Sequence, residues 1–316
     1  MDYRGDKIEV VIDWVEVEIQ LSDRSNFWTV QDHLREALQL PEGSKPGVDP
    51  LDATQTGSAS AFRFRVQDPR SMSAVTEALA ALGQRFSIET VRIVAVEVAF
   101  DTYRDGATKT DLAEIVADRY RFSSRPPPKG CYWHLYRRKG EKAITIGRAA
   151  RLGKLDNVET PRELVRCLAD EWQIADCEDR DRPDIRFHGY VKAWNDGGPI
   201  TDPAQWCARW EVTLRGSMLP IRSLQELAQF DFTKLAQHFR FCRFGDDVPR
   251  LVRHAFATTS LAQLGMKGSY PRANRSSGTR LYAGTRSYRR SMVADEMNKV
   301  IHDSCLKKLN RQWRGA

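Results

Sequence analysis

Residues Ile185–Trp194 read IRFHGYVKAW, and residues Ala208–Arg215 read ARWEVTLR. In both stretches polar and apolar side chains alternate, which is typical of β-strands with one buried face. The polar positions are Arg186, His188, Tyr190 and Lys192 in the first stretch and Arg209, Glu211, Thr213 and Arg215 in the second. If both strands belong to one sheet, basic groups, a carboxylate and a tyrosine share one of its faces.

A third predicted strand, Val91–Asp101 (VRIVAVEVAFD), carries Glu97 and Asp101 four residues apart on one face. A carboxylate in an apolar strand is costly to bury unless it is paired or binds a metal. Together with Glu211 the two acids form a candidate oxygen-only site, which suits Mg²⁺ or Mn²⁺ rather than zinc. The alternative is that Glu97 and Asp101 form surface ion pairs and that Glu211 is half of a cross-strand pair.

Tyr190 is a candidate nucleophile because Arg186, His188 and Lys192 occupy neighbouring positions on its face. A phenol with a pKa of about 10 is mostly protonated at neutral pH, and nearby cations favour the phenolate. Arg186 and Arg209 carry guanidinium groups that match phosphate geometry. These groups predict attack by tyrosine on a phosphodiester, and the alternative is an ordinary strand tyrosine.

Several other classes of protein are excluded or disfavoured by the sequence. It has no GxxxxGK[ST] motif of an ATPase and no His-hydrophobe-His pair of the two-histidine nucleases. No apolar run approaches the roughly 20 residues of a membrane span, and the first residues lack the pattern of a signal peptide. Six scattered cysteines without a CxxC motif indicate reduced thiols, so we expect a cytoplasmic protein.

The net charge of +7 is concentrated near the C-terminus. Met266–Ala316 contains 12 Lys and Arg residues against 3 Asp and Glu residues. Such a segment is either an electrostatic contact for nucleic acid or a solvated basic tail.

Hydrophobic periodicity predicts an α+β fold with a mixed or antiparallel central sheet, helices on one face, and a helical basic C-terminal region. The further expected strands are Ile8–Leu21, Ala61–Val66 and the hairpin of Cys131–Arg138 with Lys142–Arg148. The expected helices are Asn26–Leu40, Asp68–Leu82, Thr110–Tyr120, Pro161–Trp172, Leu224–Phe241, Leu251–Leu264 and Ser291–Trp313. Pro41–Gly57 and the basic segment Gly265–Arg290 are expected to be loops. We place a boundary near Gly216, between a catalytic domain (1–216) and an accessory DNA-binding region (217–316).

Between about Ile8 and Gly216 the chain resembles the rolling-circle replication initiation factor family. This family includes initiators of plasmids and filamentous phages and relaxases of some integrative conjugative elements. The matching segments are, in order, Ile12–Val15 (IDWV), Val96–Tyr103 (VEVAFDTY), Thr145–Arg148 (TIGR, in part), Tyr190–Lys192 (YVK) and Arg209–Val212 (RWEV). Each motif is short, so their order and spacing carry most of the similarity.

The resemblance implies that Tyr190 is the nucleophile and that Glu97, Asp101 and Glu211 hold a divalent metal. The strand pattern adds Lys192, Arg186 and Arg209 as catalytic candidates. Two departures from the family pattern matter. Val191 stands where an acid is common, and Leu281–Ser287 (LYAGTRS) resembles the family's YxGSR element but follows Glu211. We interpret this segment as part of a basic loop that contacts DNA. The arginines expected to make these contacts, within the segment and beside it, are Arg280, Arg286, Arg289 and Arg290. If it is instead the family element, Tyr282 or Tyr288 becomes a rival nucleophile.

The expected function is therefore origin-specific, metal-dependent nicking and joining of one DNA strand through a 5′-phosphotyrosine intermediate. The resemblance implies origin DNA as the partner, both duplex and single-stranded hairpin, together with a host helicase, and it is compatible with a homodimer. No membrane association is expected. The alternatives are a relaxase of a mobile element, which uses the same chemistry, and a DNA-binding replication regulator without catalytic activity.

Overall fold

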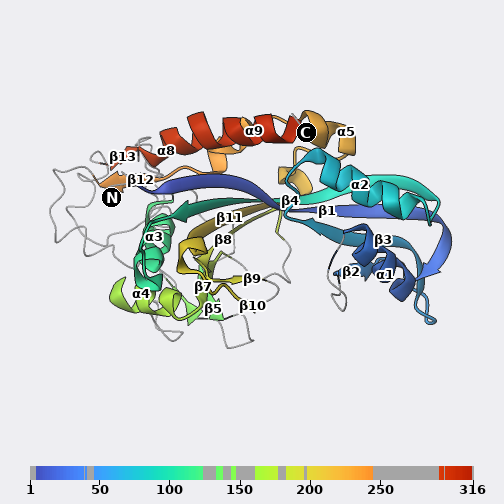
Figure 1. Ribbon diagram of the computed structural model, residues 1–316, viewed down its shortest axis with the longest axis horizontal. Helices are drawn as coiled ribbons and strands as arrows, with labels where there is room; N and C mark the ends of the chain where they lie inside the picture. Colours follow the sequence, from blue (N-terminus) through green and yellow to red (C-terminus); the bar gives the residue numbers. More distant parts are fainter. Residues whose placement is uncertain are drawn as a thin grey trace, which may run out of the picture. The chain divides into compact units, whose positions relative to one another are not determined.

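The computed structural model describes residues 5–38, 40, 46–123, 133–137, 144–146, 161–176, 183–195, 198–244, 292–294 and 296–314. The fold is α+β, as predicted, and its main sheet has nine strands in the order β2-β3-β1-β4-β11-β8-β7-β5-β6 (Figure 1). These strands are β1 (Lys7–Asn26), β2 (Val48–Pro50), β3 (Ser58–Gln67), β4 (Ile88–Tyr103), β5 (His134–Arg137), β6 (Ile144–Thr145), β7 (Trp172–Ala175), β8 (Ile185–Lys192) and β11 (Cys207–Arg215). Two small antiparallel pairs join β9 (Trp194–Asn195) to β10 (Gly198–Pro199) and β12 (Cys242–Phe244) to β13 (Met292–Ala294).

The chain forms two compact units, and it passes from one to the other several times. Unit 1 comprises Met1–Val10, Phe100–Val212 and Thr233–Leu306. Unit 2 comprises Val11–Ala99, Thr213–Phe232 and Lys307–Ala316. The functional division at Gly216 stays a prediction.

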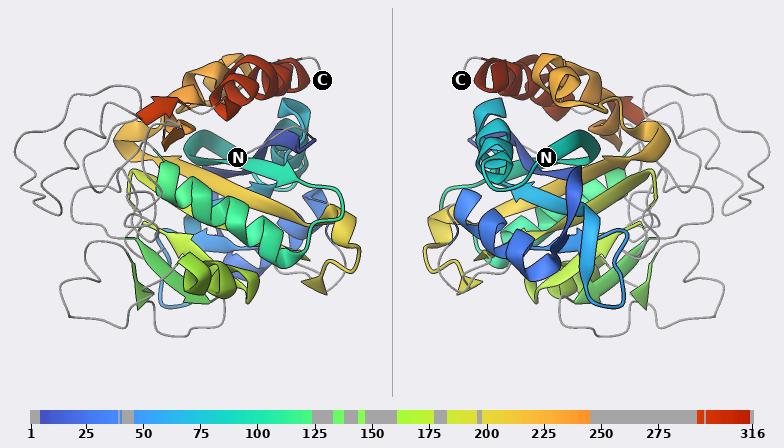
Figure 2. Two further views of the ribbon diagram at one scale, coloured as in Figure 1. Left: turned by 90° about the vertical axis from the view of Figure 1, so that its left-hand side faces the viewer. Right: turned by 90° about the vertical axis from the view of Figure 1, so that its right-hand side faces the viewer.

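In unit 1, two helices pack on one face of the sheet, α3 (Lys109–Phe122) and α4 (Pro161–Ala169) (Figure 2). The apolar positions of the strands form the core beneath them, and this core includes Phe187 and Trp210. Gly189 lets the Trp210 ring lie directly on the backbone of β8, because a Cβ atom at Gly189 would be only 2.5 Å from Trp210 Cε3. The polar side chains that alternate with these apolar ones on β8 and β11 therefore lie on the opposite face of the sheet.

The helix predicted over Pro161–Trp172 is shorter than expected. It ends at Ala169, and Trp172 belongs to β7, which the sequence analysis missed. The turn between them places Glu171 at φ 63°, in the left-handed region, so the backbone cannot continue the helix. β7 pairs antiparallel with both β5 and β8, and the predicted hairpin is present as the pair of β5 and β6.

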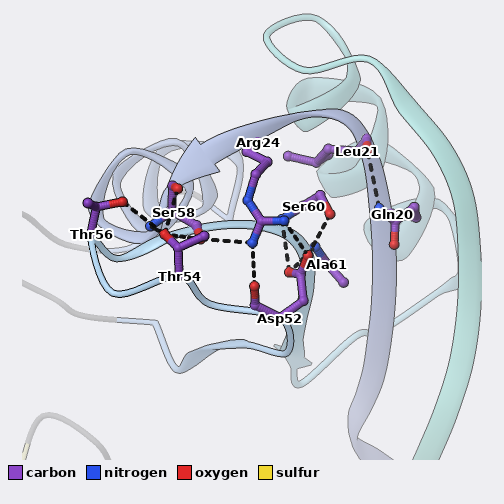
Figure 3. A network of polar contacts seen from close by, with 9 residues as sticks. All are labelled: Gln20, Leu21, Arg24, Asp52, Thr54, Thr56, Ser58, Ser60 and Ala61. Carbon is purple, nitrogen blue, oxygen red and sulfur yellow. Dashed lines mark hydrogen bonds and ion pairs between the residues drawn. The ribbon is translucent and has the colours of Figure 1, made fainter.

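In unit 2, α1 (Phe27–Ala37) and α2 (Met72–Gly83) accompany the antiparallel strands β1, β2 and β3. The helix predicted over Asp68–Leu82 begins later than expected, at Met72. Asp68 has φ 43° and donates its N–H to Asp13 O at 2.7 Å, which extends the pairing of β1 with β3, and Ser71 is the N-cap. β2 lies within the predicted loop Pro41–Gly57, and the Asp52 carboxylate orders the turn after it by accepting from Ser60 and Ala61 (Figure 3).

The predicted helix Leu224–Phe241 is divided into α5 (Leu224–Gln229) and a 3₁₀-helix at Phe232–His238. The Asn310 side chain explains the break, because it accepts from the Phe232 N–H at 2.7 Å and donates to Asp231 Oδ1 at 2.7 Å. These bonds follow Phe230, where the backbone is extended and the first helix has ended.

The predicted helix Ser291–Trp313 begins later than expected, since Met292–Ala294 is strand β13. The helical part consists of α8 (Met297–Lys299), a π-helical turn (Val300–Cys305) and α9 (Leu306–Arg314). Leu251–Leu264 and Gly265–Arg290 lie outside the described residues. None of the helices in the described part of the chain is both long and apolar enough to span a membrane.

Candidate active site

A row of polar side chains crosses the sheet of unit 1 on the face opposite α3. Tyr136 of β5 lies across from Gln173 of β7, and the pairing of Ile174 with Gly189 brings Gln173 beside β8. β8 contributes His188 and Tyr190 at alternate positions, and the neighbouring strand β11 contributes Glu211. The strand alternation predicted from sequence therefore forms a connected polar site.

Glu211 is the centre of this row. Its carboxylate is buried, with 3% of the residue exposed. The Tyr190 hydroxyl donates to Oε1 at 2.7 Å, and His188 Nδ1 lies 2.9 Å from Oε2. Arg209 Nη1 lies 3.5 Å from Oε1. A tyrosine, a histidine and an arginine thus converge on one carboxylate. This carboxylate can accept a proton or stabilise a positively charged group beside it.

Tyr136 is a second tyrosine at the site, and sequence reasoning missed it. Its hydroxyl lies 2.7 Å from His188 Nε2 and accepts from Arg186 Nη2 at 3.0 Å. The Tyr136 and His188 rings are stacked, with centroids 5.7 Å apart. Arg186, predicted as a partner of Tyr190, is therefore placed against Tyr136.

Asp101 forms a buried ion pair with Arg209. Its two oxygens accept from Arg209 Nε and Nη2, both at 2.7 Å, and both residues are buried. Burial, followed by the charge of Asp101, raises the pKa of the neighbouring Tyr103 and Cys207 side chains above their usual ranges. Neither of these groups is therefore a ready anionic nucleophile, and Asp101 holds Arg209 in position beside Glu211.

Three carboxylates gather where β1, β4 and β11 are neighbours in the sheet. Asp13, Glu97 and Glu211 each have an oxygen within 4.8 Å of the others, which identifies them as a candidate metal-binding group among the described residues. Glu97 also accepts a hydrogen bond from the Thr213 hydroxyl. Glu97 and Glu211 are buried, and carboxylates this close repel one another less when a cation lies between them. The donors are all hard oxygens, so the group fits Mg²⁺ or Mn²⁺.

The structure does not bring all the predicted site residues together in one group. The structure groups Glu97 and Glu211 with Asp13, whereas Asp101 pairs with Arg209. Direct metal ligation by Asp101 stays a prediction. Lys192 is half-buried on β8. Six predicted residues lie outside the described part of the chain, namely Arg280, Tyr282, Arg286, Tyr288, Arg289 and Arg290.

Asp13 was missed as a candidate ligand although it lies in the quoted segment Ile12–Val15. The available signal was an acid within an apolar strand, the same signal that singled out Glu97.

No protein-family model matches the chain, and no curated protein is detectably similar in sequence. One similar solved structure is a rolling circle replication initiator protein from Geobacillus stearothermophilus. The two chains share 13% identity over 78% of this chain and 92% of that one, with a TM-score of 0.30. At this level of similarity, function is inferred from the side chains of the site.

Proposed function

We propose that this protein nicks and joins one strand of DNA through a tyrosine, as an initiator of rolling-circle replication. The contact that carries the proposal is the 2.7 Å hydrogen bond from the Tyr190 hydroxyl to Glu211 Oε1. Glu211 also belongs to the acidic group of Asp13 and Glu97, which suits a divalent cation. A tyrosine beside such a group has the parts required for phosphodiester transfer.

In the proposed step the Tyr190 oxygen attacks the scissile phosphorus and transfers its proton to Glu211 Oε1. A bond forms between the Tyr190 oxygen and phosphorus, and the bond to the 3′-oxygen breaks. The 3′-oxygen takes a proton from solvent and leaves as a hydroxyl, and the 5′-phosphate remains on Tyr190. Attack by a 3′-hydroxyl on the phosphotyrosine reverses the sequence and joins the strand.

The cationic residues would hold the phosphate during this transfer. Arg209 is fixed by Asp101 at 2.7 Å, so its guanidinium is preorganised. Arg186 and Lys192 lie on the same face of β8 as Tyr190. Asp13, Glu97 and Glu211 would hold Mg²⁺ or Mn²⁺, and a bound ion would polarise the phosphate oxygens.

The proposal is tested with single-stranded oligonucleotides tiled across the DNA that encodes the chain and its flanks. With Mg²⁺ or Mn²⁺ we expect one oligonucleotide to be cleaved, and its 5′-phosphate to appear on Tyr190 in peptide mass spectrometry. Binding without cleavage would instead indicate a DNA-binding regulator. Transfer of a plasmid between cells that requires Tyr190 would indicate a relaxase. Origin DNA is the partner under this proposal, and a helicase and a homodimer stay predictions.

A further inference from the structure

Tyr136 stands in a nucleophile–histidine–carboxylate arrangement. Its hydroxyl lies 2.7 Å from His188 Nε2, and the other ring nitrogen of His188 lies 2.9 Å from Glu211 Oε2. In such an arrangement the histidine removes the proton of the nucleophile, and the carboxylate orients the ring and stabilises its charge. Tyr190 contacts Glu211 directly. By geometry, Tyr136 is therefore the tyrosine better placed for activation by histidine.

The groups around Tyr136 and His188 fit the charges that a proton transfer creates. After the transfer His188 carries two N–H donors, and Glu211 Oε2 and Gln173 Oε1 lie 2.9 Å from Nδ1 and Nε2, respectively. The phenolate would keep the donor Arg186 Nη2 at 3.0 Å. Both new charges therefore meet groups of opposite polarity that are already in place, so little reorganisation is required.

We propose that Tyr136 is a second strand-accepting nucleophile of this protein. The inference rests on the proposed nicking function and deepens it. Glu211 serves the two tyrosines through different oxygens, Oε1 for Tyr190 and Oε2 for Tyr136 by way of His188. A single carboxylate can therefore assist one tyrosine while the other carries DNA.

The second step balances in the same way as the first. The Tyr136 oxygen attacks a second phosphodiester, its proton passes to His188 Nε2, and the 3′-oxygen of that bond leaves as a hydroxyl. The released 3′-hydroxyl attacks the phosphorus held on Tyr190 and gives up its proton to solvent, and the Tyr190 oxygen leaves and regains a proton from solvent. One strand is closed, and the other remains on Tyr136. No oxidant, reductant or further reactant is required.

The test uses the full chain and the oligonucleotide that the tiling experiment identifies, with sulfur replacing the scissile 3′-oxygen. Cleavage then releases a thiol that rejoins poorly, so covalent adducts accumulate. Wild type is compared with Tyr190→Phe, Tyr136→Phe and the double variant. Tyr103→Phe is the matched control, because it removes the hydroxyl of a half-buried tyrosine at the end of β4, outside the polar row. Adduct yield and the modified tyrosine are determined by mass spectrometry, and folding is checked by thermal unfolding.

We expect Tyr190→Phe to form an adduct on Tyr136, Tyr136→Phe to form one on Tyr190, and the double variant to form none. The inference is overturned if wild type reacts at Tyr190 but folded Tyr190→Phe forms no adduct or reacts at another tyrosine. In that case the nicking function stands. If wild type forms no adduct on any tyrosine with any tiled oligonucleotide, both the nicking function and the second nucleophile are rejected.

Discussion

The Tyr190 hydroxyl and Glu211 Oε1 are joined by a 2.7 Å hydrogen bond on the polar face of unit 1. Glu211→Gln keeps the size of the side chain but weakens its ability to accept a proton. We expect strand cleavage to slow by about 10²-fold or more, with oligonucleotide affinity little changed. Glu89→Gln, at an exposed position of β4, is the control. Cleavage by Glu211→Gln at the wild-type rate would exclude Glu211 as the proton acceptor.

The acidic group predicts different effects for carboxylates that sequence analysis treated alike. Asp13→Asn and Glu97→Gln should weaken Mn²⁺ binding by about tenfold or more, as measured by electron paramagnetic resonance, because each removes a ligand charge. Asp101→Asn removes the carboxylate that makes both 2.7 Å contacts with the buried Arg209 guanidinium, so it should lower the free energy of unfolding by about 3–5 kcal/mol. A stable Asp101→Asn variant that has lost Mn²⁺ would restore Asp101 as a direct ligand.

The packing of Trp210 on Gly189 predicts a large effect for a small substitution. In Gly189→Ala the added methyl group would lie 2.5 and 2.6 Å from two Trp210 carbons and 3.3 Å from Val116 Cγ1. We expect the free energy of unfolding to fall by about 2–3 kcal/mol, as measured by chemical denaturation. Gly83→Ala has open space around the added atom and should change stability by less than about 1 kcal/mol. Equal stability of the two variants would contradict this close packing.

The hydrogen bonds in the turn at Asp52 predict that its carboxyl group titrates at a lower pH than an ordinary aspartate does. The pKa of Asp52 is lowered to about 2, first by the Ala61 N–H, then by the Ser60 hydroxyl, and least by the charge of Arg24. Since the folded pKa lies below the unfolded value of 3.8, its stabilisation is present above pH 3.8 and is lost as the pH falls toward 2. NMR of the Asp52 carboxyl carbon should show it ionised at pH 3.5. Ser60→Ala should raise the midpoint more than Arg24→Ala does.

The basic segment is better tested by substitution than by removal. Trp313 of α9 is buried, and its indole N–H donates to Leu227 O at 3.1 Å, so deletion of Met266–Ala316 would remove part of the unit 2 core. We instead expect replacement of four arginines by glutamine (Arg280, Arg286, Arg289 and Arg290) to reduce the salt dependence of single-strand binding. The slope of log K against log salt should decrease by about 3, as measured by fluorescence anisotropy. An unchanged slope would show that these arginines do not contact phosphates.

Strand alternation made much of the site predictable. The pattern in IRFHGYVKAW and ARWEVTLR correctly placed Tyr190, His188 and Glu211 on one face. Which of these side chains contact one another could not be predicted from the sequence, because the contacts depend on the order of the strands in the sheet. On sequence grounds Arg209 could pair with either Glu211 or Asp101. The positions of β4 and β11 bring both acids to it, with Asp101 at 2.7 Å and Glu211 at 3.5 Å.

Tyr136 shows why the rest could not be predicted. Its contact with His188 requires β7 between β5 and β8, and β7 was hidden at the end of a helical pattern. The left-handed backbone at Glu171 ends that helix, and a glutamate gives no sequence signal for such a turn. Asp68 was misread for a related reason, since an aspartate followed by proline is typical of a helix start, whereas here the Asp68 N–H bonds to Asp13 O.

The repeated passage of the chain between its units has a consequence for biosynthesis. Residues 307–316 belong with residues 11–99 in unit 2, and residues 1–10 belong with residues 233–306 in unit 1. Residues 11–99 therefore leave the ribosome well before the residues with which they complete the unit 2 core, and residues 1–10 leave it well before residues 233–306 of unit 1. Nascent chains that stop before α9 would expose apolar surface and be open to aggregation or proteolysis. A chain that stops before Trp313 would lack a buried part of the unit 2 core, so its folding would depend on translation through α9.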